Sequence, residues 1–287
     1  MSIDGETRLA GVLGWPVAHS RSPRLHNFWL ERYGINGAYL PLPVRAEHFA
    51  EAVRGLVRLG FAGANVTVPH KEAAYALCDS ADESARKAGA ANTLVFTPTG
   101  EIHGSNTDGF GFIEALRAGA PAYDPAKGPA VVLGAGGSAR AVVQALIAAG
   151  APEIRLVNRT PERAERLAAA LGGPIRRLAW EEAARALAGA ALLVNTTLLG
   201  MKGQPPLALD LAALPQSAPV NDIVYVPLET PLLRAARARG HPAVDGLGML
   251  LHQARAGFRA WFGRDPEVTD ALRRHVAADL IAEMERG

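Results

Sequence analysis

Short apolar runs and amphipathic stretches follow one another along the chain, a pattern of alternating strands and helices. The apolar runs end at Gly, Pro or polar residues and are too short for helices, so they predict strands. These runs lie at 9–13, 38–42, 62–68, 91–96, 101–104, 130–133, 191–195 and 219–223, and one more ends at Asn158. Helical spacing predicts helices from Ser22 through Tyr33, at 46–59, after Pro69, after Asp108, after the glycines at 134–137, and at 247–262 and 268–286.

The order of these elements predicts an α/β fold of two domains. Strands and helices alternate up to a Pro- and Gly-rich loop at 118–129, and a second alternating series follows it. No strand-like run occurs in the helical tail after Asp245. We therefore expect an N-terminal α/β domain, an inserted doubly wound domain, and C-terminal helices that return to the first domain.

Composition narrows the class of protein. The 287 residues, 49% of them hydrophobic, are enough for two globular domains. A formal net charge of +2 without a basic cluster argues against nucleic-acid and membrane partners. The single Cys78 excludes an internal disulfide framework, and we expect it in the middle of a helix. With no signal peptide visible, and with the apolar stretch 183–199 too short to span a bilayer, we expect a cytoplasmic enzyme.

A glycine-rich turn joins the strand at 130–133 to the helix that follows it. Gly134 permits a tight turn, Gly136 lets backbone N–H groups approach phosphate oxygens, and Ala139 is small enough for close helix packing. This strand–turn–helix unit favours dinucleotide binding at the helix N-terminus over a βα turn without a ligand. The loop residues expected to contact the cofactor are Gly134, Ala135, Gly136, Gly137, Ser138 and Ala139.

The next strand ends in residues that favour NADP over NAD. NAD sites usually carry an acidic residue there to bind the ribose hydroxyls. This chain has Asn158, Arg159 and Thr160, with Arg163 following, and these groups attract a 2′-phosphate through charge-assisted hydrogen bonds. The alternative is that the arginines are solvated charges and that Thr160 only caps the next helix. We expect an NADP-binding Rossmann-type domain at 108–245, and a substrate-binding and catalytic domain at 1–107 plus 246–287.

Polar residues at the ends of the early strands are candidates for substrate binding and catalysis. Ser20 and Ser22 precede a predicted helix and could grip a carboxylate, although Ser22 could equally be a helix cap. Asn65 and Thr67 share one strand face. Lys71 falls in the first turn of the next predicted helix, where the helix dipole disfavours a cation, and this costly placement suggests a function. The alternative is a flexible, solvated lysine.

Two further polar segments precede the nucleotide unit. Asn92 lies in an Ala-Ala-Asn-Thr stretch, and Asp108 is flanked by small residues ahead of a helix. Asp108 could cap that helix. It could instead pair with Lys71 and act with it on a substrate hydroxyl.

Together these segments resemble the shikimate dehydrogenase family. Seven motifs stand in the order of that family between about Gly11 and Phe262: HSRSP, NVTVPHK, AGAANT, NTDGFG, LGAGGSAR, VNRT and GLGMLLHQA. Seven ordered motifs are more specific than any one of them, and they favour the functional readings of Lys71 and Asp108.

The resemblance implies a role for each matched residue. It implies catalytic roles for Lys71 and Asp108. It implies that the substrate is held by Ser20, Ser22, Asn65, Thr67, Lys71, Asn92, Asp108, Tyr225 and Gln253. It adds Ile223 and Gly246 to the NADP-binding residues Asn158, Arg159, Thr160 and Arg163. It implies no metal, and we expect His19, His70 and His252 to be structural.

The implied reaction is the reversible, NADPH-dependent reduction of 3-dehydroshikimate to shikimate, with a small molecule as the partner of a monomer or homodimer. An alternative within the fold is a quinate/shikimate dehydrogenase of broader substrate or cofactor range, or an aminoshikimate-type enzyme. A silent dinucleotide-binding sensor is disfavoured because Lys71, Asp108 and Gln253 are all present. A glutamyl-tRNA reductase would need a nucleophilic thiol in the first domain and a basic RNA-binding face.

Overall fold

The structure is a computed structural model that describes residues 3–286, and it divides into two compact units. Unit 1 takes in the residues up to Thr107 together with Gln253–Ala278, and unit 2 takes in Asp108–His252 together with the residues from Asp279 onward. The two-domain α/β fold is confirmed, whereas the domain boundaries given above stay a prediction. The division between His252 and Gln253 falls within helix α10 (Gly246–Phe262), which therefore contributes residues to both units.

Unit 1 is built on a six-stranded mixed sheet in the order β2-β1-β3-β5-β6-β4. Its strands are β1 (Arg8–Gly14), β2 (Gly37–Pro43), β3 (Gly63–Val66), β4 (Ser80–Ala81), β5 (Thr93–Phe96) and β6 (Ile102–Ser105). β3 lies parallel to β1, and it pairs with β5 in the antiparallel sense. The carboxyl end of β3 therefore meets the amino end of β5 and the carboxyl end of β6, which brings three polar segments together.

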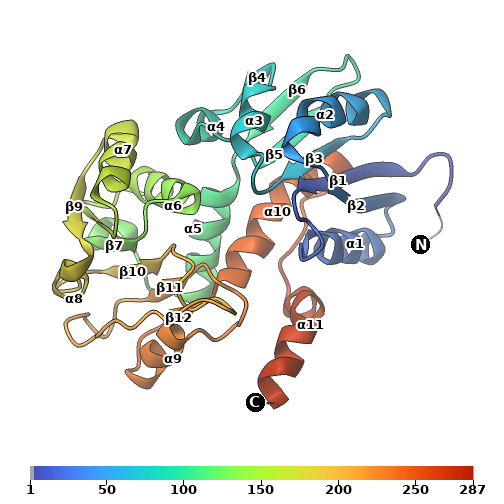
Figure 1. The fold of residues 1–287 in the computed structure, drawn as a ribbon. Helices are drawn as coiled ribbons and strands as arrows, with labels where there is room; N and C mark the ends of the chain where they lie inside the picture. Colours follow the sequence, from blue (N-terminus) through green and yellow to red (C-terminus); the bar gives the residue numbers. More distant parts are fainter. Residues whose placement is uncertain (1–2, 287) are drawn as a thin grey trace. The chain divides into compact units, whose positions relative to one another are not determined.

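Helices cover this sheet with their apolar faces. They are α1 (Ser22–Tyr33), the short η1 (Ala46–His48), α2 (Phe49–Arg58), α3 (Lys71–Ala76), α4 (Glu83–Ala88), the later part of α10 (Gly246–Phe262) and part of α11 (Asp270–Arg286). α1 packs on β2 (Figure 1). It ends where Gly34 takes a left-handed conformation (φ 62°), which a residue with a Cβ adopts only at a cost.

An aromatic cluster fills the space between α1, β2 and α10. It consists of His26, Trp29, Tyr39, Phe258 and Trp261, all buried. The His26 ring stacks on Tyr39 at 4.0 Å with the two planes 7° apart. Burial lowers the pKa of His26 to about 3, an effect that Asn65 nearby opposes only in part. The cluster therefore holds a neutral imidazole at physiological pH.

This neutral histidine should make unit 1 sensitive to acid. Its pKa is about 3 in the folded chain against 6.5 for the unperturbed group, so the unfolded chain takes up a proton first as the pH falls. Below pH 6.5 the free energy of unfolding should drop by up to about 1.4 kcal/mol per pH unit from this group alone. Replacing His26 with leucine should remove that slope, as followed by chemical unfolding between pH 7.5 and 4.5. Replacement of the exposed His275 is the control, and parallel pH curves for His26→Leu and wild type would contradict this assignment.

Unit 2 is built on a fully parallel six-stranded sheet in the order β12-β11-β10-β7-β8-β9. The strands are β7 (Ala130–Leu133), β8 (Ile154–Asn158), β9 (Ile175–Ala179), β10 (Leu192–Asn195), β11 (Val220–Asp222) and β12 (Ala243–Val244). From β7 the chain adds strands β8 and β9 on one side, and then returns to add β10, β11 and β12 on the other side, so the strand order reverses between β7 and β10. Ligands of doubly wound folds bind outside the carboxyl ends of the strands at such a switch point.

Apolar side chains on both faces of this sheet are buried, as a doubly wound sheet requires. Val132 packs with Phe112 and Val142 on one face, while the neighbouring Val131 packs with Leu187 on the other. The helices are α5 (Asp108–Gly119), η2 (Pro125–Lys127), α6 (Gly137–Ala148), α7 (Pro161–Leu171), η3 (Trp180–Glu182), α8 (Ala183–Ala186) and α9 (Pro231–Ala238). The Rossmann-type architecture predicted for this part of the chain is confirmed.

The structure differs from the predicted elements in several places. β3 ends at Val66 rather than at residue 68, and the helix predicted at 46–59 begins with the separate turn η1. β4, β9 and β12 were not predicted. Cys78 does not lie in the middle of a helix: α3 ends at Ala76, and the Cys78 thiol donates back to the Ala74 carbonyl at 3.1 Å. Burial raises the pKa of Cys78 to about 11, so the thiol stays protonated and a poor nucleophile.

Candidate active site

Lys71 is fixed by its backbone beside the end of β5. It is the first residue of α3, and its carbonyl accepts from the Ala91 N–H at 2.9 Å. His70, the residue before Lys71, fixes this turn through two contacts. Its ring stacks on Phe49, and its Nε2 lies 2.7 Å from the Val44 carbonyl oxygen. A buried His70 with these partners has the structural role expected for it. The turn leaves the Lys71 side chain half-buried in unit 1. Through the hydrogen bond to Ala91, its backbone lies beside the segment that carries Asn92.

Five buried side chains on or next to β3, β5, β6 and α10 form what we name the polar network: Asn65, Asn92, Thr93, Thr107 and Gln253. The Asn65 amide donates to the Asn92 carbonyl and to Thr93 Oγ1, both at 3.1 Å. Asn92 Oδ1 accepts from the Thr93 hydroxyl at 3.0 Å and from the Thr107 N–H at 2.9 Å.

Gln253 joins the polar network from α10. Its Oε1 accepts from the Thr107 hydroxyl at 3.2 Å and from the Asn92 amide at 3.4 Å. Thus three residues predicted to bind substrate, Asn65, Asn92 and Gln253, are brought together in unit 1. Thr93 and Thr107 were missed, although each follows an asparagine near a strand end, and that repeated Asn-Thr pair is the signal that could have found them.

Ser20 and Ser22 lie at the start of α1, as predicted. Ser22 is the first residue of the helix, and its N–H donates to Ser20 Oγ at 3.4 Å. The N-cap position is occupied by Arg21, whose side chain makes no capping hydrogen bond. The alternative that Ser22 is the N-cap residue is therefore wrong. Thr67 follows β3, with its Cγ2 only 2.5 Å from where a Cβ on Gly14 would lie.

The glycine turn of unit 2 has the geometry of a phosphate cradle. Gly134 has φ 103°, and a Cβ there would lie 2.8 Å from Thr196 Oγ1. Gly136 and Gly137 are exposed at the start of α6, and a Cβ on either would meet open space. Ala139 is fully buried under the helix. N–H groups at an open helix N-terminus suit a pyrophosphate, so this turn fits a dinucleotide.

Basic and polar groups are exposed beyond β8. Asn158 ends the strand, and its amide donates to the Thr160 carbonyl at 2.7 Å. Thr160 takes the N-cap position of α7, but its side chain makes no capping hydrogen bond. Arg159 and Arg163 are exposed near the same point. This arrangement presents two guanidinium groups and a hydroxyl where a ribose phosphate would lie.

A polar turn follows β10, and a buried carboxylate, that of Asp222, ends β11. Neither was predicted to belong to the site. Thr196 and Thr197 follow β10, and the Asn195 amide donates to Asp222 Oδ1 at 2.9 Å. Burial raises the pKa of Asp222 to about 6, although hydrogen bonds from Thr230, Val224 and Asn195 oppose the shift. The Asn-Thr-Thr run directly after a predicted strand was the available signal.

Gly246 allows two backbone segments of unit 2 to touch. A Cβ on Gly246 would lie 2.0 Å from the Ile223 carbonyl oxygen, and the Gly246 N–H donates to the Val224 carbonyl at 3.3 Å. The start of α10 is thereby fixed against the loop that carries Ile223 and Tyr225. Asp108 begins α5 in unit 2, directly after Thr107 of the polar network, and its pairing with Lys71 stays a prediction.

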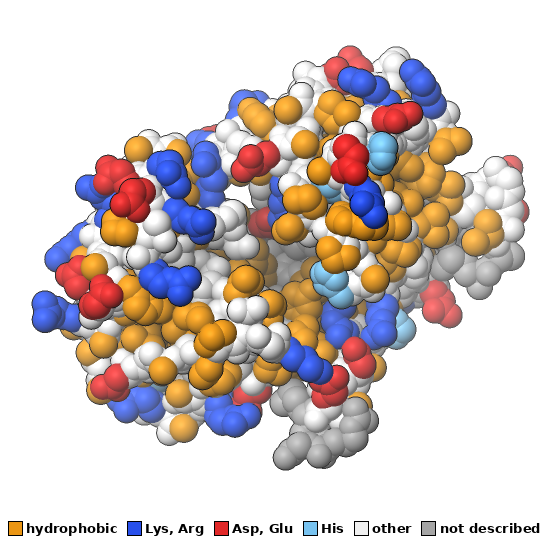
Figure 2. Space-filling model, in the orientation of Figure 1, with side chains coloured by type: hydrophobic (Ala, Val, Ile, Leu, Met, Phe, Trp, Pro, Cys, Tyr) orange, Lys and Arg blue, Asp and Glu red, His pale blue; other side chains and the backbone are white. Residues whose placement is uncertain are grey.

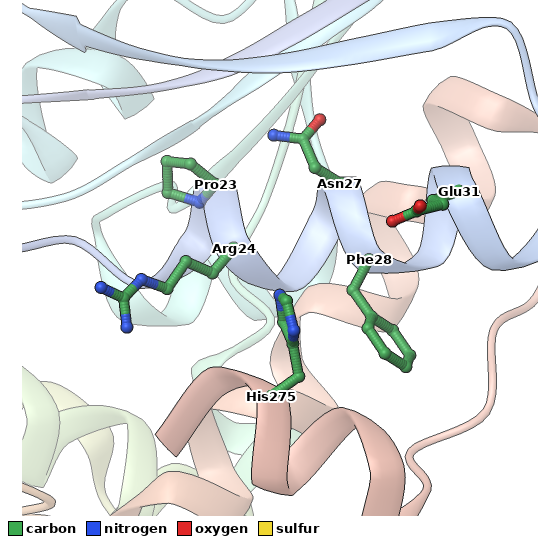
Figure 3. Close-up of a pocket in the computed structure, with 6 residues that line it drawn as sticks. All are labelled: Pro23, Arg24, Asn27, Phe28, Glu31 and His275. Atoms are coloured by element: carbon green, nitrogen blue, oxygen red, sulfur yellow. The ribbon is translucent and has the colours of Figure 1, made fainter. Parts of the chain in front are cut away.

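A separate pocket of about 450 Å³ lies in unit 1 between α1 and α11. It is lined by Pro23, Arg24, Asn27, Phe28, Glu31 and His275. Figure 3 shows His275 extending from α11 toward α1, where its ring lies 5.1 Å from that of Phe28. None of the residues predicted to bind substrate or cofactor lines this pocket.

Among residues 3–286, His, Cys, Asp and Glu side chains form no group of three or more that could hold a metal ion. No helix within the same residues has the length and apolar character needed to cross a membrane. On the face drawn in Figure 2, basic and acidic side chains are interspersed.

Known proteins resemble this chain over nearly its whole length. Three family models match: the shikimate dehydrogenase substrate binding domain at residues 12–94, shikimate / quinate 5-dehydrogenase at 122–199, and the shikimate 5'-dehydrogenase C-terminal domain at 246–276. A relative from Paramagnetospirillum magneticum named shikimate dehydrogenase (NADP(+)) is 64% identical, over 96% of this chain and 99% of its own length.

Two solved structures show the same fold. Shikimate 5-dehydrogenase from Thermus thermophilus, in complex with NADP(H) and shikimate, is 40% identical with a TM-score of 0.84, covering 96% of this chain and 100% of that one. Quinate dehydrogenase from Corynebacterium glutamicum, in complex with NAD, is 31% identical with a TM-score of 0.87, covering 96% and 99%. The resemblance inferred from the seven motifs is confirmed, and the chain belongs to the shikimate dehydrogenase family.

Proposed function

We propose that the chain catalyses the reversible, NADPH-dependent reduction of 3-dehydroshikimate to shikimate. The observation that carries this proposal is the 64% identity, along nearly the full length of both chains, to a relative named shikimate dehydrogenase (NADP(+)). The test is a spectrophotometric assay of NADPH formation from shikimate and NADP⁺. Absence of turnover by the folded protein would contradict the proposal.

The substrate site is assigned mainly to unit 1. Ser20 and Ser22, with the N–H groups at the start of α1, bind the substrate carboxylate. The ring and its hydroxyls are held by Asn65, Thr67, Asn92, Gln253 and Tyr225. The hydrogen bonds within the polar network support this assignment, because they fix Asn92 and Gln253 before a ligand arrives.

The proton in this reaction is assigned to Lys71. When bound, NADPH supplies the hydride that the ring carbonyl carbon accepts. The carbonyl oxygen then needs a proton, and the Lys71 ammonium donates it, so that the C=O group becomes CH–OH. Asp108 holds the Lys71 ammonium near that oxygen. In the oxidation of shikimate, Lys71 takes the same proton back.

The cofactor site is assigned to unit 2. The open glycines at the start of α6 and the small Ala139 beneath them support binding of the pyrophosphate there, with Ala135 and Ser138 alongside. Asn158, Arg159, Thr160 and Arg163 surround the 2′-phosphate. Ile223 and Gly246, which are held together by their backbones, lie at the nicotinamide end.

Removing the charge of Arg159 should weaken NADP⁺ more than NAD⁺. A charge-assisted hydrogen bond contributes about 1.5–3 kcal/mol, so KM for NADP⁺ should rise about 10- to 100-fold in Arg159→Ala. KM for NAD⁺ should stay within about twofold, since NAD⁺ has no phosphate at that position. Steady-state kinetics with both cofactors checks this, and Arg166→Ala, which removes an exposed arginine of the helix α7 that follows Arg159, is the matched control. Equal losses for both cofactors would place the phosphate elsewhere.

Quinate dehydrogenase activity is the second candidate function. The structural similarity to quinate dehydrogenase from Corynebacterium glutamicum favours including it. Asn158, in place of an acidic residue at the end of β8, argues for NADP over NAD. Comparing kcat/KM for shikimate and quinate with each cofactor separates the two, and a higher value for quinate with NAD⁺ would favour the second. The state of the protein as a monomer or homodimer stays a prediction, as does its cytoplasmic location.

A further inference from the structure

Tyr39 is a buried tyrosine of β2 that touches two residues assigned to the substrate site. Only 1% of its side chain is exposed. Its hydroxyl donates to Asn65 Oδ1 at 2.7 Å, and it also hydrogen-bonds the Ser22 side chain. Tyr39 thus links the start of α1 to the end of β3.

The Asn92 carbonyl, which can only accept, decides which way the Asn65 amide faces, and the Tyr39 hydroxyl donates to the Oδ1 atom that this orientation leaves on the other side. In the observed orientation, the amide nitrogen donates to the Asn92 carbonyl and to Thr93 Oγ1. A flipped amide would put Oδ1 against the Asn92 carbonyl, where two acceptors repel. Both amide hydrogens are used within the protein, so Asn65 meets a ligand through Oδ1 and favours a group that donates, such as a hydroxyl.

The aromatic cluster holds the Tyr39 ring in place. His26 stacks on one face of the ring, and Trp261 lies 6.0 Å away, centroid to centroid. The Tyr39 N–H and carbonyl are both hydrogen-bonded to the Asn27 side chain, at 3.0 and 2.9 Å. A phenol fixed by its backbone and by its ring can hold the Asn65 amide with little freedom to turn.

We propose that Tyr39 is a positioning residue for the substrate, and that its hydroxyl restrains the Asn65 side chain through Oδ1. The identity of the substrate in this inference rests on the proposed function. The restraint of Asn65 by Tyr39 is independent of it, because it is a property of the ligand-free protein.

The variant Tyr39→Phe removes the hydroxyl and keeps the ring. We expect KM for shikimate to rise about tenfold, the effect of one lost hydrogen bond of ordinary strength, while KM for NADP⁺ stays within twofold. In an Asn65→Ala background the same substitution should have little further effect on KM, because the amide that the Tyr39 hydroxyl restrains is absent. Tyr33→Phe is the matched control: this tyrosine of the same unit accepts a hydrogen bond from the Glu267 N–H at 3.1 Å and touches no residue of the polar network.

A second measurement does not depend on activity. In ¹⁵N–¹H spectra of the ligand-free protein, the side-chain amide of Asn65 should shift or broaden in Tyr39→Phe and remain unchanged in Tyr33→Phe. An unchanged Asn65 signal together with an unchanged KM for shikimate would overturn the proposal. If the wild-type protein fails to turn over shikimate, the proposed function fails, and the Asn65 signal alone decides the role of Tyr39.

Discussion

Replacing Lys71 with alanine is expected to lower kcat for shikimate oxidation by about 10²- to 10⁴-fold, the usual contribution of a positioned acid or base. The backbone of Lys71 holds the α3 turn through its carbonyl, and that bond survives the substitution. The residues proposed to bind NADP lie in unit 2 and do not include Lys71, so the Kd of NADPH should stay within about twofold. Steady-state kinetics and NADPH fluorescence titration measure the two quantities separately.

Two further variants sharpen this test. Lys87→Ala removes an exposed lysine of the same unit that pairs with Glu83 on α4, and exposed pairs of this kind contribute less than about 1 kcal/mol, so kcat should not change. Added methylamine should restore part of the activity of Lys71→Ala, because a free amine can occupy the space of the missing ammonium group. Near-normal turnover in Lys71→Ala would remove this residue from the reaction.

Replacing Gly246 with alanine is expected to prevent unit 2 from reaching its native packing. The added Cβ would lie 2.0 Å from the Ile223 carbonyl oxygen and 2.3 Å from the carbonyl carbon. Both atoms belong to the backbone, which cannot swing away as a flexible side chain could. We expect a loss of about 3 kcal/mol or more in the free energy of unfolding, from overpacking that forces the backbone to shift. Calorimetry and the yield of soluble protein check the result.

The matched control for this prediction is another helical glycine. Gly55 lies within α2, and a Cβ there would meet nothing within 4 Å. Gly55→Ala should raise stability by up to about 1 kcal/mol, because alanine restricts the unfolded chain and favours the helix. If Gly246→Ala keeps the wild-type Tm, the close approach of α10 to the Ile223 loop does not exist in solution.

The cofactor half of the site could be predicted from the sequence because its signals are local. The glycine turn, the small Ala139 and the polar end of β8 lie within thirty residues of one another, and each acts through backbone geometry that its own residue type dictates. The placement of Lys71 in the first turn of a predicted helix suggested a function and a pairing with Asp108. That argument left open a solvated lysine and an aspartate that only caps a helix, and the resemblance to a family favoured the catalytic roles.

The remaining parts of the site depend on contacts between distant residues. Tyr39 meets Asn65 from 26 positions away, and Thr107 meets Gln253 from 146 positions away. Tyr39 sits in a strand where tyrosine is a common residue, so its type alone predicts nothing about a hydrogen bond. The strand β9 was missed for another reason: its edge position leaves Arg176 and Arg177 exposed, and the expected apolar run is absent.

The polar network also constrains how this chain can diverge. Each member hydrogen-bonds a neighbour, so an apolar replacement of Thr93 or Thr107 would remove one donor from Asn92 Oδ1 or from Gln253 Oε1 and cost about 1 kcal/mol. A second replacement beside the first would cost less, because its partner would already have lost that hydrogen bond. Substitutions at these positions should therefore be epistatic. A path toward a different substrate that exchanges network members in neighbouring pairs would lose less stability than one that exchanges them separately.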